Sequence, residues 1–353
     1  MMKKKVLVLF GGVSSEHEVS LVSASSVISR IPADKYDIKA MGITRDGRFL
    51  LYSGDPALLP ESRWLEDESK LEKAVISCDR SHHGIIHLES GEIEYIDVVF
   101  PVLHGKNGED GTMQGLLEIS GIPYVGCDTA SSAICMDKAV TNAMADFIGI
   151  PQAKWAAFGK AAYYAEKNAL LRDAAEKLGF PIFVKPANAG SSVGISKASD
   201  MAELEKACDL AFTHDKKVVL EENIVGYEVE CAVLGNEDPV ASIPGEIVAC
   251  NDFYDYDAKY LANKSELHIP ARLSAEKLED VRKTAIKAYS ALGCAGLARV
   301  DFFVRKSDGL VMLNETNTIP GFTSISMYPK LFEASGIPYS ELLDKLINYA
   351  IER

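Results

Sequence analysis

Apolar residues near the start of the chain occur in a short continuous run, followed by a helically spaced set. The run from Val6 to Phe10 stops at a pair of glycines, which is typical of a buried strand. Apolar side chains then recur at helical spacing through residues 21–31. Ser15, followed by Glu18 three positions later, predicts a capping box at the start of that helix.

Further apolar runs continue the strand and helix alternation through the first third of the chain. Strands are expected at 36–43, 96–103 and 122–127. Because a strand, a helix and a second strand follow one another, we expect parallel pairing. Residues 1–137 are therefore interpreted as one doubly wound α/β domain.

A second and smaller α/β unit is predicted for residues 138–225. A first helix is expected from Asp137. After "WAAF" (155–158), a longer helix carries Leu170, Ala174 and Leu178 at four-residue spacing and ends at Gly179. Ser199 is expected to cap a further helix. The remaining predicted elements are strands at 181–185 and 217–224, with a glycine- and serine-rich loop at 186–194.

The last predicted unit, residues 226–353, begins with the alternating strand "YEVECAVLG", which we expect to be half exposed. Ser274 to Leu292 has the pattern of an amphipathic helix. A hairpin follows, formed by "LARVDFFV", the turn "RKSDG" and "LVMLNETN". The polar and aromatic stretch 251–268 has no periodic pattern, and loops of this length are usually functional or disordered.

The two hairpin strands carry polar residues where the alternation would place them on one face. Arg299 and Asp301 share a face of the first strand, and Glu315 and Asn317 share a face of the second. If the register is even, all four converge, whereas a slip of one residue separates them. Two carboxylates and an amide oxygen suit Mg²⁺. A solvated sheet face with a salt bridge explains the same residues equally well.

Composition limits the classes of protein that need to be considered. The chain has 353 residues, of which 47% are hydrophobic and 25% charged, as in ordinary globular proteins. Its net charge of −14 argues against nucleic-acid binding, which requires a basic surface. The seven cysteines form no C-x-x-C pair, so neither a zinc site nor a disulfide framework is indicated. No apolar segment is long enough to span a membrane, and we expect a cytoplasmic protein.

Three further stretches carry residues that suit a phosphate or nucleotide ligand, although each has an ordinary structural explanation. "FVKPANAGSSVG" places Lys185 before a flexible loop, which can hold phosphate but is not a Walker A sequence. Lys138 can bind phosphate or lie on a solvated face. The acidic "EENIVGYE" suits adenine and ribose or a protected sheet edge. "LHGKNGEDGTMQG" is rich in glycine, and His104 within it can be structural.

Taken together and in this order, the motifs resemble those of D-alanine–D-alanine ligases, members of the ATP-grasp superfamily. The resemblance runs from about Lys5 to the C-terminus. It includes "GGVSSEHEVSL", "HGKNGEDGTMQG", "CMDK", "FVKPANAGSSVG", "EENIVGYE", "FYDYDAKY", "ARVDFF" and "NETNTIPGFTSIS". It implies three α/β domains, with ATP between the central and C-terminal ones. It also implies ATP and two Mg²⁺ ions, with Mn²⁺ as a substitute, D-alanine as substrate, and a homodimer.

The resemblance assigns a role to individual residues. For ATP these are Lys138, Lys185, Ser192, Glu221, Glu222, Ile224, Glu228 and Lys259; for the metal ions, Asp301, Glu315 and Asn317. A network of Glu16, Ser191 and Tyr260 would receive the first D-alanine, and Arg299 with the Gly321 N–H would stabilise an oxyanion. His104, Ser326 and Met327 would border the second substrate. The 251–268 stretch would form a lid.

The implied reaction explains these residue types. A carboxylate must first accept the γ-phosphoryl group of ATP, a step that depends on positioning and charge neutralisation. The amine of a second D-alanine then attacks the acylphosphate through an oxyanion, and water must be excluded.

Two alternatives remain open at this stage. Ligation of D-alanine to D-serine is the closer one, since a methyl-sized pocket rejects an added hydroxyl only weakly. In the resemblance, Tyr260 accompanies amino-acid acceptors and is missing from relatives that use lactate, while Met327 is apolar where several relatives with altered acceptors carry arginine. We therefore favour D-alanine as the acceptor. The more distant alternative is a non-catalytic nucleotide-binding regulator, which would be expected to have lost at least one of the four polar hairpin residues.

Overall fold

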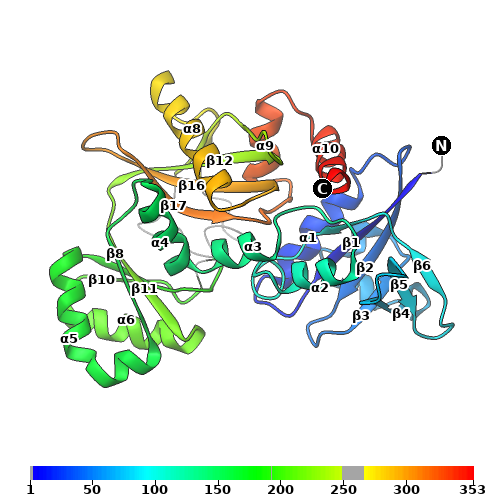
Figure 1. Ribbon diagram of the computed structural model, residues 1–353, viewed down its shortest axis with the longest axis horizontal. Coiled ribbons are helices and arrows are strands. Elements are labelled where there is room, and N and C mark those ends of the chain that lie inside the picture. Colours follow the sequence, from blue (N-terminus) through cyan, green and yellow to red (C-terminus); the bar gives the residue numbers. More distant parts are fainter. Residues whose placement is uncertain (1–2, 192, 249–265) are drawn as a thin grey trace.

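The part of the chain that the structure describes forms three β-sheets, each built from one continuous part of the sequence (Figure 1). The computed structural model describes residues 3–191, 193–248 and 266–353. The predicted 251–268 loop therefore lies mostly outside the described residues. In Figure 1 the first sheet is blue to cyan, the second is green, and the third runs from yellow-green to orange.

The first sheet is mixed, so the prediction of a doubly wound domain was wrong. Strands β2, β1 and β7 pair in parallel, but β2 through β6 pair antiparallel as a meander. The strands are β1 (Lys4–Gly11), β2 (Tyr36–Ile43), β3 (Phe49–Tyr52), β4 (Leu71–Ile76), β5 (Gly84–His87), β6 (Ile93–Tyr95) and β7 (Val98–Pro101). Helices α1 (His17–Ile28) and α2 (Thr112–Ser120) belong to the same part of the chain, with short 3-10 helices at Pro56–Leu58, Arg63–Leu65 and Glu68–Lys70.

Two local predictions in this part were also wrong. Ser15 does not cap helix α1: Glu16 occupies the N-cap position, and its backbone N–H donates to the Ser14 hydroxyl at 3.1 Å. The expected strand at 122–127 is reduced to a single bridge between Val99 and Tyr124. The chain turns at Gly126, whose φ of 108° interrupts an extended conformation.

The second sheet has the strand order β10-β9-β11-β8 and is antiparallel throughout. Its strands are β8 (Trp155–Gly159), β9 (Ile182–Pro186), β10 (Ser196–Ala198) and β11 (Lys217–Glu222), and its helices are α5 (Lys160–Leu178) and α6 (Met201–His214). Gly179 ends α5 as predicted. The cap of α6 is Asp200, which accepts from the Glu203 N–H at 2.9 Å, and not Ser199. Helices α3 (Thr129–Met136) and α4 (Lys138–Ile148) connect this sheet to the first.

The third sheet has the order β15-β14-β12-β16-β17, with β13 paired to β12. Its elements are β12 (Gly226–Gly235), β13 (Val240–Ala241), β14 (Gly245–Val248), β15 (Glu266–His268), α8 (Ala275–Ala291), β16 (Gly296–Arg305), β17 (Val311–Asn317), α9 (Met327–Ala334) and α10 (Tyr339–Glu352). Ser274 caps α8 as the sequence predicts. Strand β12 is buried from Val229 onward, so the expectation of a half-exposed strand was wrong.

One hydrophobic core joins the first sheet to the C-terminal helices. Val8 and Phe100 of the sheet belong to the same buried cluster as Leu346 of α10 and Tyr328 of α9. Polar contacts reinforce this junction, since the Tyr36 hydroxyl donates to Asp344 at 2.8 Å. Figure 1 shows α10 beside the blue strands, although the two lie at opposite ends of the chain. This packing fixes the first sheet against the third.

Candidate active site

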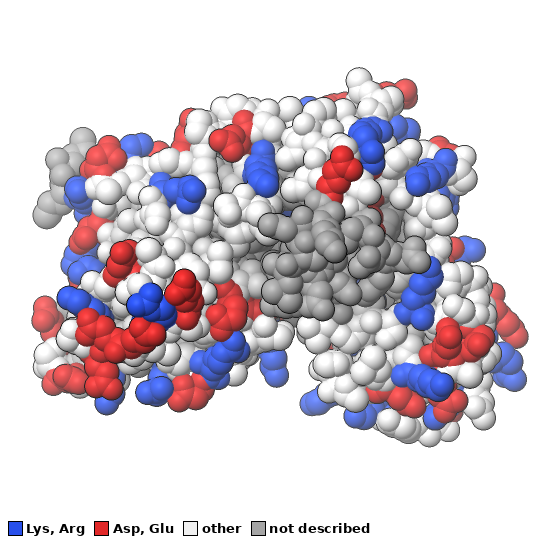
Figure 2. Space-filling model, turned by 180° about the vertical axis from the view of Figure 1, so that it is seen from behind, with Lys and Arg blue, Asp and Glu red and all other residues white. Residues whose placement is uncertain are grey.

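A cavity of about 520 Å³ lies where parts of all three sheets meet. Its wall includes Glu16 from the start of α1, Lys185 from β9 and Arg299 from β16. Both signs of charge therefore line one enclosed space. In Figure 2 the side of the molecule opposite to the view of Figure 1 is hollowed between the units.

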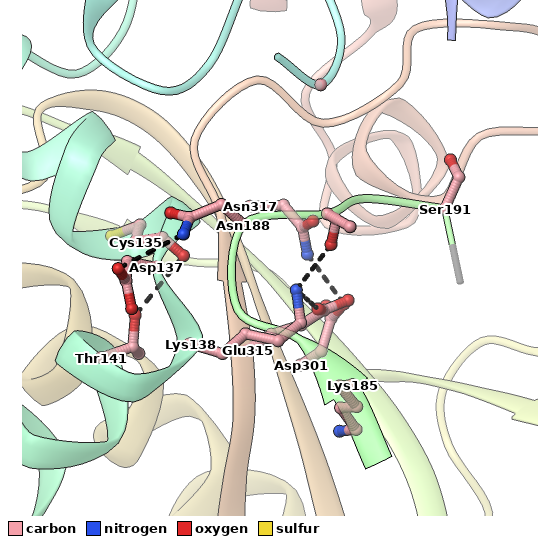
Figure 3. Close-up of polar contacts among 12 residues, drawn as sticks. Cys135, Asp137, Lys138, Thr141, Lys185, Asn188, Ser191, Asp301, Glu315 and Asn317 are labelled. Carbon is pink, nitrogen blue, oxygen red and sulfur yellow. Dashed lines mark hydrogen bonds and ion pairs between the residues drawn. The ribbon is translucent and has the colours of Figure 1, made fainter. Parts of the chain in front are cut away.

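The hairpin of β16 and β17 contributes the most polar part of the wall. Arg299 pairs with Asn317, and Asp301 pairs with Glu315, so the register is even and the four predicted residues share one face. Asp301 is 7% exposed and accepts from Asn317 Nδ2 at 2.9 Å. Figure 3 shows the side chains of Asp301, Glu315 and Asn317 grouped around the end of Lys138. The convergence expected from the alternation is confirmed.

A β-bulge ends this polar face. After Asp301 pairs with Glu315, Phe302 pairs with Leu313, and Asn314 is passed over. The shift reverses which face the β17 side chains occupy. Leu313 consequently joins Phe302 in a buried core, whereas uninterrupted alternation from Glu315 would have placed it on the polar face.

Arg299 is held by two carboxylates, one on its own strand β16 and one on the neighbouring strand β12. Its guanidinium lies 2.7 Å from Asp301 Oδ2 and 2.9 Å from Glu230 Oε2. Burial alone would lower the pKa of Arg299, but Asp301 and Glu230 raise it well above its usual value. The guanidinium is therefore permanently charged and fixed in direction, which suits stabilisation of a developing negative charge.

The two predicted phosphate lysines reach the cavity from different elements. Lys138, the first residue of α4, donates from Nζ to the Ala189 carbonyl at 2.8 Å and lies 3.8 Å from Glu315 Oε2. Lys185 forms an ion pair of 2.6 Å with Glu221. Burial disfavours the charge on Lys185, yet Glu221, followed by Glu315 and Glu228, raises its pKa. Both ammonium groups thus border the carboxylates of the hairpin.

The Glu16 carboxylate is enclosed by two glycines. It is 6% exposed, and it accepts a hydrogen bond from the Ser191 hydroxyl across the junction of the first and second sheets. A Cβ atom placed on Gly105 would lie 2.4 Å from Glu16 Oε2, and one on Gly190 would lie 2.6 Å away. Only residues without a side chain fit at these positions. Two of the three members of the predicted Glu16–Ser191–Tyr260 network are therefore in contact.

His104 is a buried link between the first sheet and the C-terminal part. Its Nδ1 lies 3.1 Å from the Ile319 carbonyl and therefore carries the proton, while Nε2 lies 3.2 Å from the Ser23 hydroxyl and accepts from it. Burial lowers the pKa of His104, despite the opposing effect of Glu16. The ring is neutral and positions the 319–322 segment at the cavity.

Glu109 is a wall residue that the sequence interpretation missed. It lines the cavity, and its Oε1 accepts from the Gly105 N–H at 3.0 Å. Burial, followed by the nearby Glu16 carboxylate, raises the pKa of Glu109 to about 8. The only signal in the sequence was its place in the quoted glycine-rich stretch.

Turn residues near the C-terminal end of β17 form another part of the wall. Gly321, Ser326 and Met327 all line the cavity. The Ser326 hydroxyl accepts from the Thr323 N–H at 2.9 Å, and Met327 is 5% exposed at the start of α9. Lys330, one turn further along the helix, also lines the cavity and was not predicted.

Nearly all of the predicted residues that the structure describes surround this one cavity. In addition to those above, the wall includes Glu222, Ile224 and Glu228. Asp301 does not line the cavity itself, but it accepts hydrogen bonds from Arg299 and Asn317, which do. Ser192, Lys259 and Tyr260 lie outside the described residues. Glu230, like Glu109 and Lys330, was missed.

The hairpin donors fit a hard divalent cation. Among the described residues, no group of three or more histidine, cysteine, aspartate or glutamate side chains could hold a metal ion alone. The hairpin offers two carboxylates and one amide, an incomplete set. Mg²⁺ commonly binds through one or two carboxylates and takes its other ligands from water and phosphate oxygens. The donor chemistry is therefore that of a metal shared with a nucleotide.

The second and third sheets, with lysines and carboxylates facing a shared cavity, define an α/β enzyme of the ATP-grasp fold. The family model described as "D-ala D-ala ligase N-terminus" matches residues 5–127, and "D-ala D-ala ligase C-terminus" matches residues 144–348. The chain belongs to the D-alanine–D-alanine ligase family of carbon–nitrogen ligases.

Full-length relatives agree with this membership. The chain is 52% identical to the D-alanine–D-alanine ligase of Acetivibrio thermocellus, covering 99% of this chain and 96% of that protein. It is also 52% identical to that of Caldicellulosiruptor bescii, covering 100% and 96%.

Solved structures share the same fold, and one of them is of an enzyme named for a different acceptor. The VanG D-Ala:D-Ser ligase from Enterococcus faecalis is 44% identical with a TM-score of 0.91, covering 99% of this chain and 100% of that one. The D-alanine–D-alanine ligase from Coxiella burnetii is 36% identical with a TM-score of 0.86, covering 99% and 96%.

Proposed function

We propose that this protein uses ATP to join two D-alanines into D-alanyl-D-alanine through a D-alanyl phosphate, as a step in peptidoglycan precursor synthesis. The observation that carries the proposal is the cavity in which Lys138, Lys185 and Arg299 line the same wall as Glu16 and Glu315. Such a wall can neutralise a triphosphate and also hold an amino acid by both of its charged groups.

Each group on the wall has a place in this reaction. Lys138 and Lys185 bind the ATP phosphates, and Glu221, Glu222, Ile224 and Glu228 border the adenine and ribose. Asp301, Glu315 and Asn317 would hold two Mg²⁺ ions, with Glu315 shared and Mn²⁺ as a substitute. The bound ions supply neutralisation of phosphate charge during transfer.

The amino-acid substrates use the remaining wall. Glu16, fixed by Ser191, accepts the ammonium of the first D-alanine. Arg299 and the Gly321 N–H receive the oxyanion that forms when the second amine attacks, and each such donor typically contributes about 2.7–4 kcal/mol. His104, Ser326 and Met327 border the second D-alanine. The assignments of Ser192 and Lys259 to ATP, and of Tyr260 and the 251–268 lid to closure, stay predictions.

We further propose the setting in which the reaction occurs. The domain boundaries remain those predicted, at 1–137, 138–225 and 226–353, and the enzyme acts as a cytoplasmic homodimer without nucleic-acid or membrane partners. None of the helices that the structure describes is long and apolar enough to cross a bilayer.

The direct test incubates the full-length protein with ATP, MgCl₂ and D-alanine. We expect ADP, phosphate and the dipeptide in equal amounts, identified by coupled assay and mass spectrometry. Phosphate release that does not depend on D-alanine, or no dipeptide at all, would overturn the proposal.

A D-alanine–D-serine ligase is the second candidate, and the similarity to the E. faecalis structure favours considering it. Met327 is apolar and buried at the acceptor wall, which favours a methyl group over a hydroxymethyl group. Offering D-alanine and D-serine together at equal concentration decides between them. A product mixture dominated by D-alanyl-D-serine would reject the first candidate.

A further inference from the structure

Two carboxyl groups of the cavity wall meet at a single glycine. The Gly105 N–H donates to Glu109 Oε1 at 3.0 Å, while a Cβ on the same residue would lie 2.4 Å from Glu16 Oε2. One residue without a side chain therefore separates the two acids. Both face the cavity described above, which independently defines the site.

The backbone on both sides of this pair is fixed. The Ser14 hydroxyl accepts from the Glu16 N–H at 3.1 Å and donates to the His104 carbonyl at 2.8 Å, so it ties the two loops together. The Glu109 N–H donates to the Gly105 carbonyl at 3.0 Å, closing a tight turn. The backbone positions of Glu16 and Glu109 relative to each other are therefore set by these bonds.

The charged groups around Glu109 come from three elements. Glu16 approaches from the start of α1, Glu315 from β17 and Lys138 from α4, while His104 in the same loop is neutral. Burial and then Glu16 raise the pKa of Glu109 to about 8; Glu315 acts in the same direction, and Lys138 opposes it. At neutral pH, the Glu109 carboxyl therefore keeps its proton.

We propose that Glu109 is a second acceptor, beside Glu16, for the ammonium group of the first D-amino acid, and that it releases its proton when this group binds. The inference rests on the proposed function. One oxygen of Glu16 is already engaged by Ser191, and a second carboxylate on the other side of Gly105 adds acceptors for the remaining ammonium N–H groups. Arg299 on the same cavity wall can receive the substrate carboxylate.

The proton balance of the step is simple. The ammonium keeps its three protons, and no bond between heavy atoms forms or breaks. The O–H bond of Glu109 breaks, and its proton passes to solvent. A cation placed beside Glu109 lowers the pKa of its carboxyl, so binding and proton release are linked. Between pH 6 and 8, D-alanine affinity therefore rises with pH by up to about tenfold per unit.

Calorimetry of the full-length protein tests this step without turnover. D-Alanine is titrated at pH 7, in the absence of ATP and Mg²⁺, in HEPES and in Tris, whose ionisation enthalpies differ. We expect close to one proton released by the wild type and close to none by Glu109→Gln. The matched control Glu89→Gln, an exposed acid near the β5–β6 turn, should behave as wild type.

Several results would overturn the inference. These are a wild-type proton count near zero, an unchanged count in Glu109→Gln, or release of the same proton by MgCl₂ alone. If Glu109→Gln fails to fold, Glu109→Asp replaces it, with its carboxyl one methylene shorter. We expect the aspartate variant to release a proton but bind D-alanine about tenfold more weakly. Wild-type affinity in that variant would exclude direct contact.

Steady-state kinetics separate this inference from the proposed function. The second amine must also lose a proton, so the wild-type pH profile of kcat/KM is not diagnostic alone. Between pH 6 and 8, we expect kcat/KM to rise less steeply with pH in Glu109→Gln than in the wild type. The difference in slope should reach up to about a factor of ten per pH unit. Dipeptide formation with identical slopes in both proteins would reject the inference and leave the proposed function standing.

Discussion

Charged side chains of the cavity wall are held by partners of opposite charge, either on the same strand or on a neighbouring one. Lys185 pairs with Glu221 at 2.6 Å, and Arg299 pairs with Asp301 at 2.7 Å. Removing one member of a buried pair leaves the other uncompensated, which costs more than the pair itself contributes. The effect of replacing a charged wall residue by a neutral one should therefore depend on which charged partner it leaves uncompensated.

Glu315→Gln keeps the size of the side chain and removes one charge. We expect dipeptide formation to fall by at least about 10²-fold, because the metal ions proposed to neutralise the phosphate charge would lose a carboxylate ligand. The melting temperature should stay within about 3 °C of wild type. Glu333→Gln, an exposed change on α9, is the control and should retain full turnover. Near-normal activity of Glu315→Gln would contradict the metal assignment.

Glu109→Gln should stabilise the protein in a pH-dependent way. The Glu109 carboxyl ordinarily loses its proton near pH 4.5 but keeps it in the folded protein up to about pH 8. The folded state therefore binds more protons over this range, and the wild-type free energy of unfolding falls as pH rises. Glutamine does not titrate. The melting temperature of the variant should exceed that of the wild type by the largest amount at pH 8 and by the smallest at pH 5.

Thermal melts at several pH values in the absence of ligands provide the measurement. Glu89→Gln again serves as the control and should show no such trend. A difference in melting temperature that is constant or shrinks from pH 5 to pH 8 would show that Glu109 does not carry a raised pKa.

At the scale of elements, the loop between β9 and β10 is the part that joins separate units at the cavity. The Lys138 N–H donates to the Ala187 carbonyl at 3.0 Å, and Asn188 donates to Asp215 at 2.9 Å. Ser191 at the far end of the loop contacts Glu16. The position of the loop therefore determines the position of the Glu16 carboxylate.

Gly190→Ala tests this dependence. Its Cβ would lie 2.6 Å from Glu16 Oε2, so either the loop or the carboxylate must move. We expect kcat/KM for D-alanine to fall by about 10- to 100-fold, because a displacement near 1 Å disrupts substrate positioning. Gly159→Ala, whose Cβ would meet nothing nearer than 3.8 Å, is the matched control. Equal activity of the two variants would show that Glu16 tolerates displacement.

Elements defined by local periodicity were predicted well. The helix expected from Ser274 to Leu292 has these two residues as its caps, because its apolar spacing and its capping serine are both local. The hairpin register was correct at Arg299 and Asp301, since alternation places their side chains on one face.

Features that depend on distant parts of the chain were missed. The bulge that passes over Asn314 arises where Leu313 must reach a core shared with Phe302. The meander from β3 to β6 is made of short strands, and only their pairing gives them regular structure. Glu109 gains its unusual environment from Glu16, ninety-three positions earlier, which no local pattern contains.

At the scale of the whole molecule, helix α10 completes the core of the first sheet. Leu346 is fully buried and belongs to the same cluster as Val8 and Phe100. Arg353 near the end of this helix donates to the Tyr124 carbonyl at 2.8 Å. The two ends of the chain should therefore unfold together.

Leu346→Ala should destabilise the first sheet from a distance. Loss of a buried leucine typically costs about 2–5 kcal/mol, so the melting temperature should fall by about 5 °C or more. The chain has two tryptophans, and a Trp155→Phe background leaves Trp64 of the first unit as the fluorescent probe. Leu210→Ala, at a position that is 46% exposed, is the control. Unchanged melting of the Trp64 signal would show that the first sheet folds independently.

The contact between Ser191 and Glu16 has a thermodynamic consequence. A nucleotide that binds against the 186–194 loop acts on the same segment that orients the acceptor for the first amino acid. Any change in D-alanine affinity caused by the nucleotide must be matched by an equal change in nucleotide affinity caused by D-alanine. One hydroxyl group thus couples the binding of the two substrates, so the affinity for each is expected to depend on whether the other is already in place.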